Sequence, residues 1–275
     1  MIKNSNIRFK VEKGRVLVPV GEPCPFGCKY CYTRGGEVGP ARVQMDEILS
    51  KLKVFASQNE FETLQFGYDG DPFARSERGI TMLQELSGLG KHINFSTKAF
   101  LDEQTMKALR EIQKNMERAG RILSAQVSLS CWASASSIEP HTPAPALRMQ
   151  TVQNLHTIHV PAFICVRPIL PHIDDSEYIR IIDEGLQASC DGFILGPLYA
   201  DDRGRFVRFI PSQALRNVPN TRGKVPWSAH SPEWTRYEDI TRFEHIRSII
   251  SEKGGRVFES SAYAVEFANR GGVLV

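Results

Sequence analysis

Short apolar runs alternate with amphipathic segments along most of this 275-residue chain. Such runs fit strands buried on both faces of a parallel sheet, and the segments between them have the spacing of helices packed on that sheet. The predicted strands span residues 16–20, 63–66, 93–96, 125–130, 162–166 and 192–195. The predicted helices span 45–56, 80–89, 102–119, 147–158, a segment that starts near 174, and 238–251.

Six β-α steps in succession predict an α/β fold, a partial (β/α)6 TIM-type barrel with a C-terminal extension. Eight such units make a complete barrel, so six leave the barrel open. A doubly wound open sheet is the competing topology, and periodicity alone does not separate the two. Local signals bound the third helix, where Asp102 is a plausible N-cap and Gly120 a plausible terminator.

The alternation of apolar runs and amphipathic segments is lost after Pro197. We therefore divide the chain into a barrel over 1–195 and an extension over 196–275, which we expect to cover the barrel mouth. Residues 201–236 lack clean periodicity and hold seven basic and three acidic side chains, an excess of +4 against +3 for the whole chain. This segment fits either a surface for phosphates and bases or a solvated loop over the barrel. The interleaved aromatic residues are Phe206, Phe209, Trp227 and Trp234, and His230 and Tyr237 are candidate substrate contacts.

Composition excludes several classes of protein. The chain is 41% hydrophobic and 24% charged, as in ordinary globular proteins. The mild net charge excludes a histone-like protein, and no apolar run is long enough to predict a membrane span. The first residues contain no apolar signal region, so we expect a cytoplasmic protein.

The strongest chemical signal is a group of three cysteines directly after the first predicted strand. Cys24, Cys28 and Cys31 follow a C-x3-C-x2-C spacing, which favours metal binding over disulfides in a chain of this length. Ferredoxin-type and structural zinc sites have four ligands, and the nearest histidine in the sequence is His92. Three ligands therefore favour a cluster with one open iron, and zinc completed by a distant histidine stays as an alternative. The isolated cysteines fit buried apolar positions: Cys131, Cys165 and Cys190.

The cysteine motif and four further segments, each after a successive predicted strand, resemble the radical S-adenosylmethionine (SAM) superfamily, and within it the spore photoproduct lyase-like branch. The tyrosines Tyr30 and Tyr32 flank Cys31 as they do in that branch. The resemblance covers about residues 15–196. The further segments are Asp69–Phe73 for T-D-P-Y, Thr97-Lys98 for T-K, Glu139 to Arg148 for E-P-x-x-P…R, and Pro168–Asp175 for P-I-I-P…D.

The resemblance implies a partial barrel that holds a [4Fe-4S] cluster on Cys24, Cys28 and Cys31, with SAM on the fourth iron. Reduction would cleave SAM to methionine and a 5′-deoxyadenosyl radical, which abstracts hydrogen from the substrate. The resemblance also implies an electron donor such as flavodoxin or ferredoxin as a partner.

The resemblance implies SAM contacts at the strand ends. Lys98 would pair with the SAM carboxylate, and Ser128 and Ser130, which alternate along one predicted strand, would meet its ribose. Asp69 and Asp71 are candidate acceptors for the SAM ammonium, because an ammonium needs oxygen partners. Each candidate has a structural alternative. Lys98 would be a surface lysine, the two serines would be polar residues that fill the barrel mouth, and the segment of the two aspartates would be a simple glycine-rich turn.

Arg167 and three tyrosines complete the candidate site. Arg167 would hold an anionic group of SAM or substrate, or else close a salt bridge within the barrel. Tyr30 and Tyr32 are candidate catalytic residues. Tyr30 would lie against the adenine of SAM or pack in the core. The lyases place a hydrogen-donating cysteine three residues before the aspartate of the second-strand motif, where this chain has Tyr68. Tyr68 would donate or relay hydrogen, or simply pack.

The sequence therefore predicts a radical SAM enzyme that acts on a nucleotide or nucleic acid. One alternative keeps the radical chemistry and directs it at a peptide or small metabolite. The other is a non-catalytic, metal-stabilised protein that binds nucleic acid with its basic extension.

Overall fold

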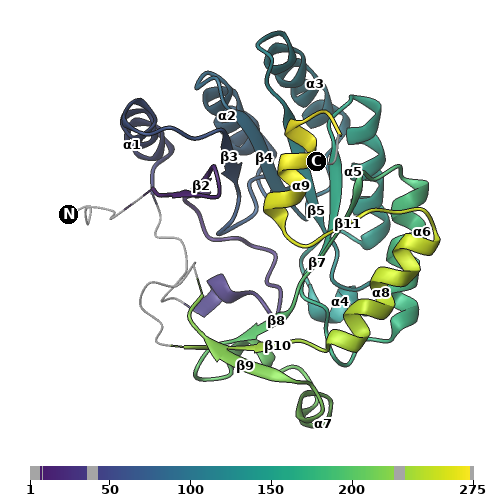
Figure 1. Ribbon diagram of the computed structural model, residues 1–275. Helices are drawn as coiled ribbons and strands as arrows, with labels where there is room; N and C mark the ends of the chain where they lie inside the picture. The colour runs from purple at the N-terminus through teal and green to yellow at the C-terminus, as the bar shows by residue number, and fades with distance from the viewer. Residues whose placement is uncertain (1–6, 8, 36–42, 226–232, 273–275) are drawn as a thin grey trace.

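The computed structural model describes residues 7, 9–35, 43–225 and 233–272, and it has an α/β fold (Figure 1). The main sheet has eight strands in the order β1-β2-β3-β4-β5-β6-β7-β11. β1 pairs antiparallel with β2, and all other pairings in this sheet are parallel. The strands are β1 (Val11–Glu12), β2 (Arg15–Val18), β3 (Thr63–Phe66), β4 (His92–Thr97), β5 (Leu123–Ser128), β6 (Ala162–Val166), β7 (Gly192–Leu195) and β11 (Val257–Phe258).

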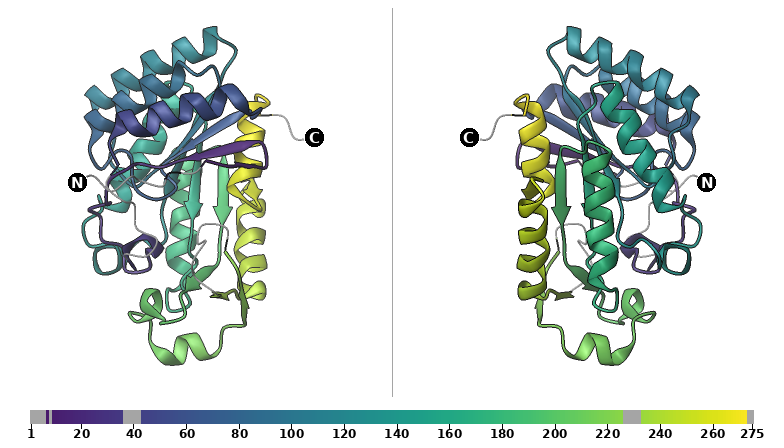
Figure 2. Two further views of the ribbon diagram at one scale, coloured as in Figure 1. Left: turned by 90° about the vertical axis from the view of Figure 1, so that its left-hand side faces the viewer. Right: turned by 90° about the vertical axis from the view of Figure 1, so that its right-hand side faces the viewer.

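Helices cover the convex face of this sheet (Figure 2). Parallel strands are covered on both faces, and β3 and β6 are accordingly buried along their whole length. The six predicted strands and the barrel architecture are confirmed. No helix in the described part of the chain combines the length and apolarity that crossing a bilayer requires. The helices between the strands are α1 (Met45–Gln58), α2 (Ser76–Ser87), α3 (Glu103–Arg118), α4 (Ala135–Ile138), α5 (Pro145–Thr157) and α6 (Asp175–Gln187).

The boundaries of α3 follow the predicted signals. The Asp102 side chain accepts a hydrogen bond from Thr105 N at 2.8 Å, which caps the first turn. Gly120 follows the helix with φ of +66°, a conformation that glycine adopts without strain.

The main sheet gains a further parallel strand from the part of the chain after residue 195. After α8 (Ile240–Glu252), the chain adds β11 in parallel to β7 and ends in α9 (Ser261–Asn269). A strand of two residues is too short for a periodicity signal, so the sequence pattern places it in the tail.

The C-terminal helix α9 lies on the concave face of the sheet (Figure 1). At its N-terminal end, Ser261 Oγ accepts a hydrogen bond from Arg167 at 3.2 Å. At its C-terminal end, Asn269 Nδ2 donates to Thr63 Oγ1 at 2.9 Å. The helix therefore spans the open side of the barrel from the end of β6 to the start of β3. Its packing forms a separate apolar cluster of Phe163, Cys165, Ile194, Phe258, Ala264, Phe267 and Ala268.

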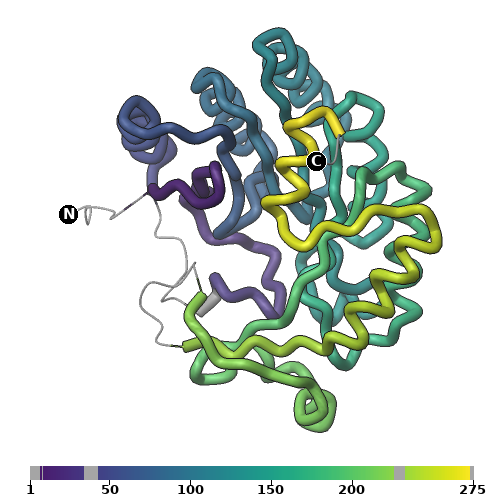
Figure 3. The backbone as a smooth tube through the Cα atoms, in the orientation of Figure 1, coloured from purple at the N-terminus to yellow at the C-terminus, as the bar shows by residue number. Residues whose placement is uncertain are grey.

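A small antiparallel sheet lies beyond the C-terminal end of β7, in the order β8-β10-β9 (Figure 1). The green part of the tube in Figure 3 follows the path of the chain through this region. The predicted aromatic surface is wrong in part, because the rings of Phe206 and Trp234 are buried and stack at 5.6 Å. They form the core of this sheet, against which Tyr32 of the cysteine loop packs. Trp227 and His230 lie outside the described residues. The elements here are β8 (Leu198–Ala200), η2 (Arg205–Val207), α7 (Ser212–Arg216), β9 (Asn220–Gly223) and β10 (Trp234–Tyr237).

Candidate active site

The cysteine loop connects β2 to the short helix η1 (Tyr32–Gly35) and is docked on the segment 138–141. Lys29 N donates to the Ile138 carbonyl at 2.9 Å, and His141 N donates to the Phe26 carbonyl at 3.3 Å. Gly27 has φ of +68°, and a Cβ there would meet the His141 ring at 3.0 Å. The loop conformation thus depends on glycine at this position and on the segment after β5.

The three thiols of this loop interact electrostatically. Burial, with a smaller contribution from Cys31, raises the pKa of Cys24 to about 11 and the pKa of Cys28 to about 12. The Cys31 sulfur faces Thr33 Oγ1 at 3.0 Å. Within the described ranges, no three His, Cys, Asp or Glu side chains already converge as a metal site. The donor set still fits a [4Fe-4S] cluster, because three thiols on one loop are its ligands and lose their protons when it binds.

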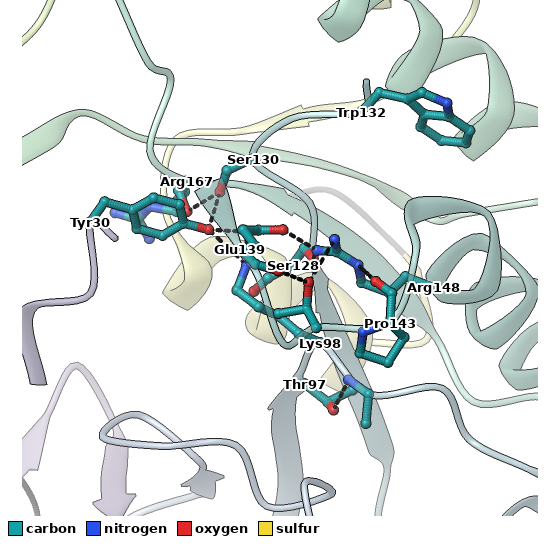
Figure 4. A network of polar contacts seen from close by, with 12 residues as sticks. Tyr30, Thr97, Lys98, Ser128, Ser130, Trp132, Glu139, Pro143, Arg148 and Arg167 are labelled. Atoms are coloured by element: carbon teal, nitrogen blue, oxygen red, sulfur yellow. Dashed lines mark hydrogen bonds and ion pairs between the residues drawn. The ribbon is translucent and has the colours of Figure 1, made fainter. Parts of the chain in front are cut away.

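Tyr30 joins the cysteine loop to a polar network at the ends of the strands (Figure 4). Its hydroxyl accepts a hydrogen bond from Lys98 Nζ at 3.0 Å and contacts Glu139 Oε1 directly. Ser130 Oγ lies 2.9 Å from the same hydroxyl and donates to the Arg167 carbonyl at 2.7 Å. The ends of β4, β5 and β6 therefore meet the cysteine loop at Tyr30, as expected for the C-terminal edge of a barrel.

Glu139 joins two basic side chains in this network. Its Oε1 lies 2.8 Å from Lys98 Nζ, and its Oε2 forms an ion pair with Arg148 Nη1 at 2.7 Å without an aligned hydrogen bond. Both Glu139 and Arg148 are fully buried. Arg148 also donates to the carbonyls of Ser128 and Pro143, at 2.9 Å each. These bonds fix the guanidinium, which in turn fixes the carboxylate.

The charges in this network hold one another in their ionised forms. Burial would raise the pKa of Glu139, but Lys98 and Arg148 lower it to about 2. Burial would likewise lower the pKa of Lys98, but Glu139 holds it above its usual value. One carboxylate and two cations give the network a net charge of +1, which suits an anionic group.

The two candidate aspartates are engaged by the protein itself. Asp71 accepts from Phe73 N and Thr97 Oγ1 at 2.9 Å each and from Lys98 N at 2.5 Å. Asp69 accepts from Val20 N at 2.9 Å. Both are buried, so they position the ends of β2 and β4. Their contact with the SAM ammonium stays a prediction.

The remaining candidates divide between the site and its surroundings. Tyr32 donates a hydrogen bond to the Tyr68 carbonyl, and burial raises the pKa of both phenols. β5 ends at Ser128, so Ser130 lies beyond the strand rather than on it, and of these two serines it is Ser130 that forms a hydrogen bond with Tyr30. Arg167 forms no salt bridge with any described carboxylate, and its bond to Ser261 leaves it in the barrel interior.

Glu139 and Arg148 belong to a motif recognised in the sequence, but neither was predicted to be a site residue. Their signal was their residue type, because a Glu and an Arg that are both fully buried need charged partners. Of the three isolated cysteines, Cys131 and Cys165 are buried as predicted and Cys190 is half-buried, and none of the six cysteines forms a disulfide.

The fold and the cysteine loop together define an iron–sulfur enzyme class built on an incomplete β/α barrel. The model of the radical SAM superfamily matches residues 18–185, and the chain therefore belongs to this superfamily. Membership implies a [4Fe-4S] cluster and SAM as cofactors. A search of the curated proteins gave no match.

Solved structures with a similar fold include spore photoproduct lyase. Its complex with dinucleoside spore photoproduct has a TM-score of 0.70 at 14% identity and covers 94% of this chain and 81% of its own. A variant with bound SAM and the same dinucleoside has a TM-score of 0.71, with the same identity and coverage. SuiB of Streptococcus suis bound to SAM has a TM-score of 0.56 at 10% identity and covers 91% of this chain and 51% of its own. At these identities the likeness is one of fold.

Proposed function

We propose that this radical SAM enzyme abstracts hydrogen from an anionic, ring-bearing substrate, namely a nucleotide or nucleic acid. When bound, the cluster supplies the electron that cleaves SAM to methionine and a 5′-deoxyadenosyl radical. The protein's part is to orient SAM and substrate and to exclude water and stray hydrogen donors.

One observation carries the substrate class: the basic small sheet is docked on the cysteine loop through Tyr32, which packs on its Phe206–Trp234 core. A substrate held by this sheet would lie next to the cluster cysteines. Phosphates are held by exposed arginines and lysines, mainly through charge. The exposed basic side chains of this region are Arg203, Arg208, Arg216, Arg222, Lys224 and Arg236.

The network around Glu139 supports the proposed SAM contacts. A lysine ammonium has three N–H donors, and Tyr30 and Glu139 engage two of those of Lys98. The third is left for the SAM carboxylate, and the net charge of +1 favours it. Tyr30 would lie against the adenine, with Ser128 and Ser130 near the ribose. Tyr68, whose carbonyl holds Tyr32, would donate or relay hydrogen in place of the missing cysteine.

The experiment is to follow 5′-deoxyadenosine formation with candidate substrates. Enzyme reconstituted without oxygen is incubated with SAM and dithionite, then with single-stranded DNA, RNA or nucleotide pools. We expect these to raise the rate above the uncoupled background. The variant R222Q/K224Q should lose much of the stimulation, and K114Q, on the exposed face of α3, should keep it. Stimulation by peptides or neutral metabolites, and by no nucleic acid or nucleotide, would overturn the proposal.

A further inference from the structure

The concave face of the sheet carries a band of polar side chains across β2 to β5. Residues directly opposite each other in register share a face, which places Gln65, Asn94 and Ser124 in one row. Asn94 Nδ2 donates to Ser124 Oγ at 2.9 Å, and Gln126 Nε2 donates to Asn94 Oδ1 at 3.0 Å. These groups are neutral and buried, so the band offers hydrogen bonds without charge.

Arg15 brings a positive charge to this band. It pairs in register with Thr63, whose side chain contacts α9, so Arg15 shares the concave face. Its Nη1 donates to Gln65 Oε1 at 2.5 Å, and its Nε is buried without a hydrogen-bond partner among the described residues. Burial lowers the pKa of Arg15, Glu12 opposes this, and the positive charge of Arg167 lowers the pKa further.

Arg167 reaches the same interior from the opposite wall. It follows β6 two residues after Cys165, which lies on the α9 side of the sheet, and it donates to Ser261 of α9. Gly196 makes room for it, because a Cβ at this position would collide with Arg167 Nε. Arg167 also lies near the cysteine loop, since its charge lowers the pKa of Tyr32 against the larger effect of burial.

Neither guanidinium forms an ion pair with a carboxylate in the described part of the chain, and Glu12, which lies opposite Arg15 on β1, attracts Arg15 without a direct ion pair. Their hydrogen bonds go to neutral groups: Gln65 for Arg15, and Ser261 and the Cys165 thiol for Arg167. Charges withdrawn from water are normally paired, so two half-buried like charges that repel each other across a polar interior are stabilised by an anion. Guanidinium forks match the oxygens of a phosphate with paired hydrogen bonds.

We propose that Arg15 and Arg167 form a subsite inside the barrel that binds a phosphate group carried by the substrate. This inference deepens the proposed function: one phosphate of the substrate is held deep in the barrel, so that the group to be attacked faces the cysteine loop, and any further phosphates of a longer substrate are left to the exposed basic side chains of the small sheet. The shared chemistry is a phosphate, whether it belongs to a nucleotide or is free in solution.

The test compares ligands that differ only in the phosphate. Dissociation constants for the cluster-loaded enzyme are measured by calorimetry with nucleoside 5′-monophosphates, the matching nucleosides and inorganic phosphate. We expect each nucleotide to bind about 10- to 100-fold more tightly than its nucleoside, the range for charge-assisted hydrogen bonds. Inorganic phosphate should bind weakly at the same place and compete with the nucleotide.

Variants locate the phosphate. R15M and R167M should each reduce the preference for nucleotide over nucleoside at least tenfold, and R15K should lose part of it. G196A, which displaces Arg167, should act like R167M, whereas G223A, with open space at its Cβ, should not. Without ligand, R15M and R167M should melt at about the same or a higher temperature, because each removes one of two half-buried like charges that repel each other.

The comparison variant R222M removes an exposed arginine of the small sheet, which the proposed function assigns to further phosphates of a longer substrate and not to the single phosphate of a nucleoside monophosphate. If R222M abolishes the phosphate preference and R15M does not, the phosphate lies on the surface and the subsite is wrong. Equal affinity of nucleotide and nucleoside for the wild-type enzyme overturns it as well. The proposed function fails separately: nucleotides that bind through Arg15 without stimulating SAM cleavage would leave the subsite standing. If nucleotides stimulate SAM cleavage equally in the wild type and in R15M, the subsite is wrong and the proposed function still stands.

Discussion

Glu139 Oε1 lies 2.8 Å from Lys98 Nζ, and this ion pair connects the loop after β5 to the end of β4 beside the cysteine loop. Glu139 is held from its other side by Arg148, which is fully buried. The lysine proposed to meet SAM therefore has its position set by residues that the sequence places more than 40 positions away.

Lys98→Met should weaken SAM binding. The methionine keeps the apolar stem but removes the ammonium, while Glu139 stays paired with Arg148. A charge-assisted hydrogen bond corresponds to a loss of about 10- to 100-fold in affinity. Equilibrium dialysis of the reconstituted protein measures this, with Lys114→Met as control and iron content as a check on the cluster. Unchanged SAM affinity would remove Lys98 from the SAM site.

Glu139→Gln should destabilise the fold strongly, because it leaves the Lys98 and Arg148 cations near each other without an anion. Breaking a buried ion pair in this way costs about 3–5 kcal/mol. Adding Arg148→Met removes one of the two cations, so the double variant should lose less stability than the sum of the single variants. Urea unfolding measures all of them, and strict additivity would show that the charges do not interact.

Asp69→Asn should stabilise the protein at neutral pH. Burial raises the pKa of Asp69 to about 6, above the usual 3.8. The fold therefore favours the protonated acid, and wild-type stability falls as the pH rises from about 4 through 6. Asparagine keeps the oxygen that accepts from Val20 N and carries no charge. Its advantage should reach at most about 3 kcal/mol at pH 8 and vanish at pH 4. Unfolding at both pH values tests this, and an advantage independent of pH would contradict it.

Trp234→Ala should loosen the small sheet and leave the barrel intact. The indole is 2% exposed and stacks on Phe206, so its loss opens a cavity in a core of few side chains. Hydrogen exchange should rise in β8 to β10 and around Tyr32, and stay unchanged in β4 to β6. Tyr263→Ala, at a ring that is 51% exposed, is the control. Exchange that rises evenly over the whole chain would show that the small sheet is not a separate unit.

The repeating barrel strands were predictable because β3, β5, β6 and β7 are short buried runs between helices of regular period. β11 was not, since its two residues carry no period and join the sheet only through β7. Phe206 and Trp234 show a second limit. Aromatic residues among arginines read as a surface, and only tertiary packing makes them a core.

The candidate site was predictable where spacing carries the chemistry, as in Cys24, Cys28 and Cys31. It was less predictable where contacts between distant segments decide the role. The hydrogen bonds of Asp71 to Thr97 and Lys98, and the pairing of Glu139 with Arg148, appear only when β3, β4 and β5 lie side by side.

The central claim is that this chain cleaves SAM reductively at a cluster held by Cys24, Cys28 and Cys31. The most direct measurement is 5′-deoxyadenosine formed per mole of anaerobically reconstituted protein with SAM and dithionite, together with iron and sulfide content. We expect about four irons with matching sulfide and steady formation of 5′-deoxyadenosine. The triple alanine variant of these cysteines should lose both, and Cys190→Ala should lose neither. Stoichiometric zinc without sulfide, and no 5′-deoxyadenosine, would contradict the account.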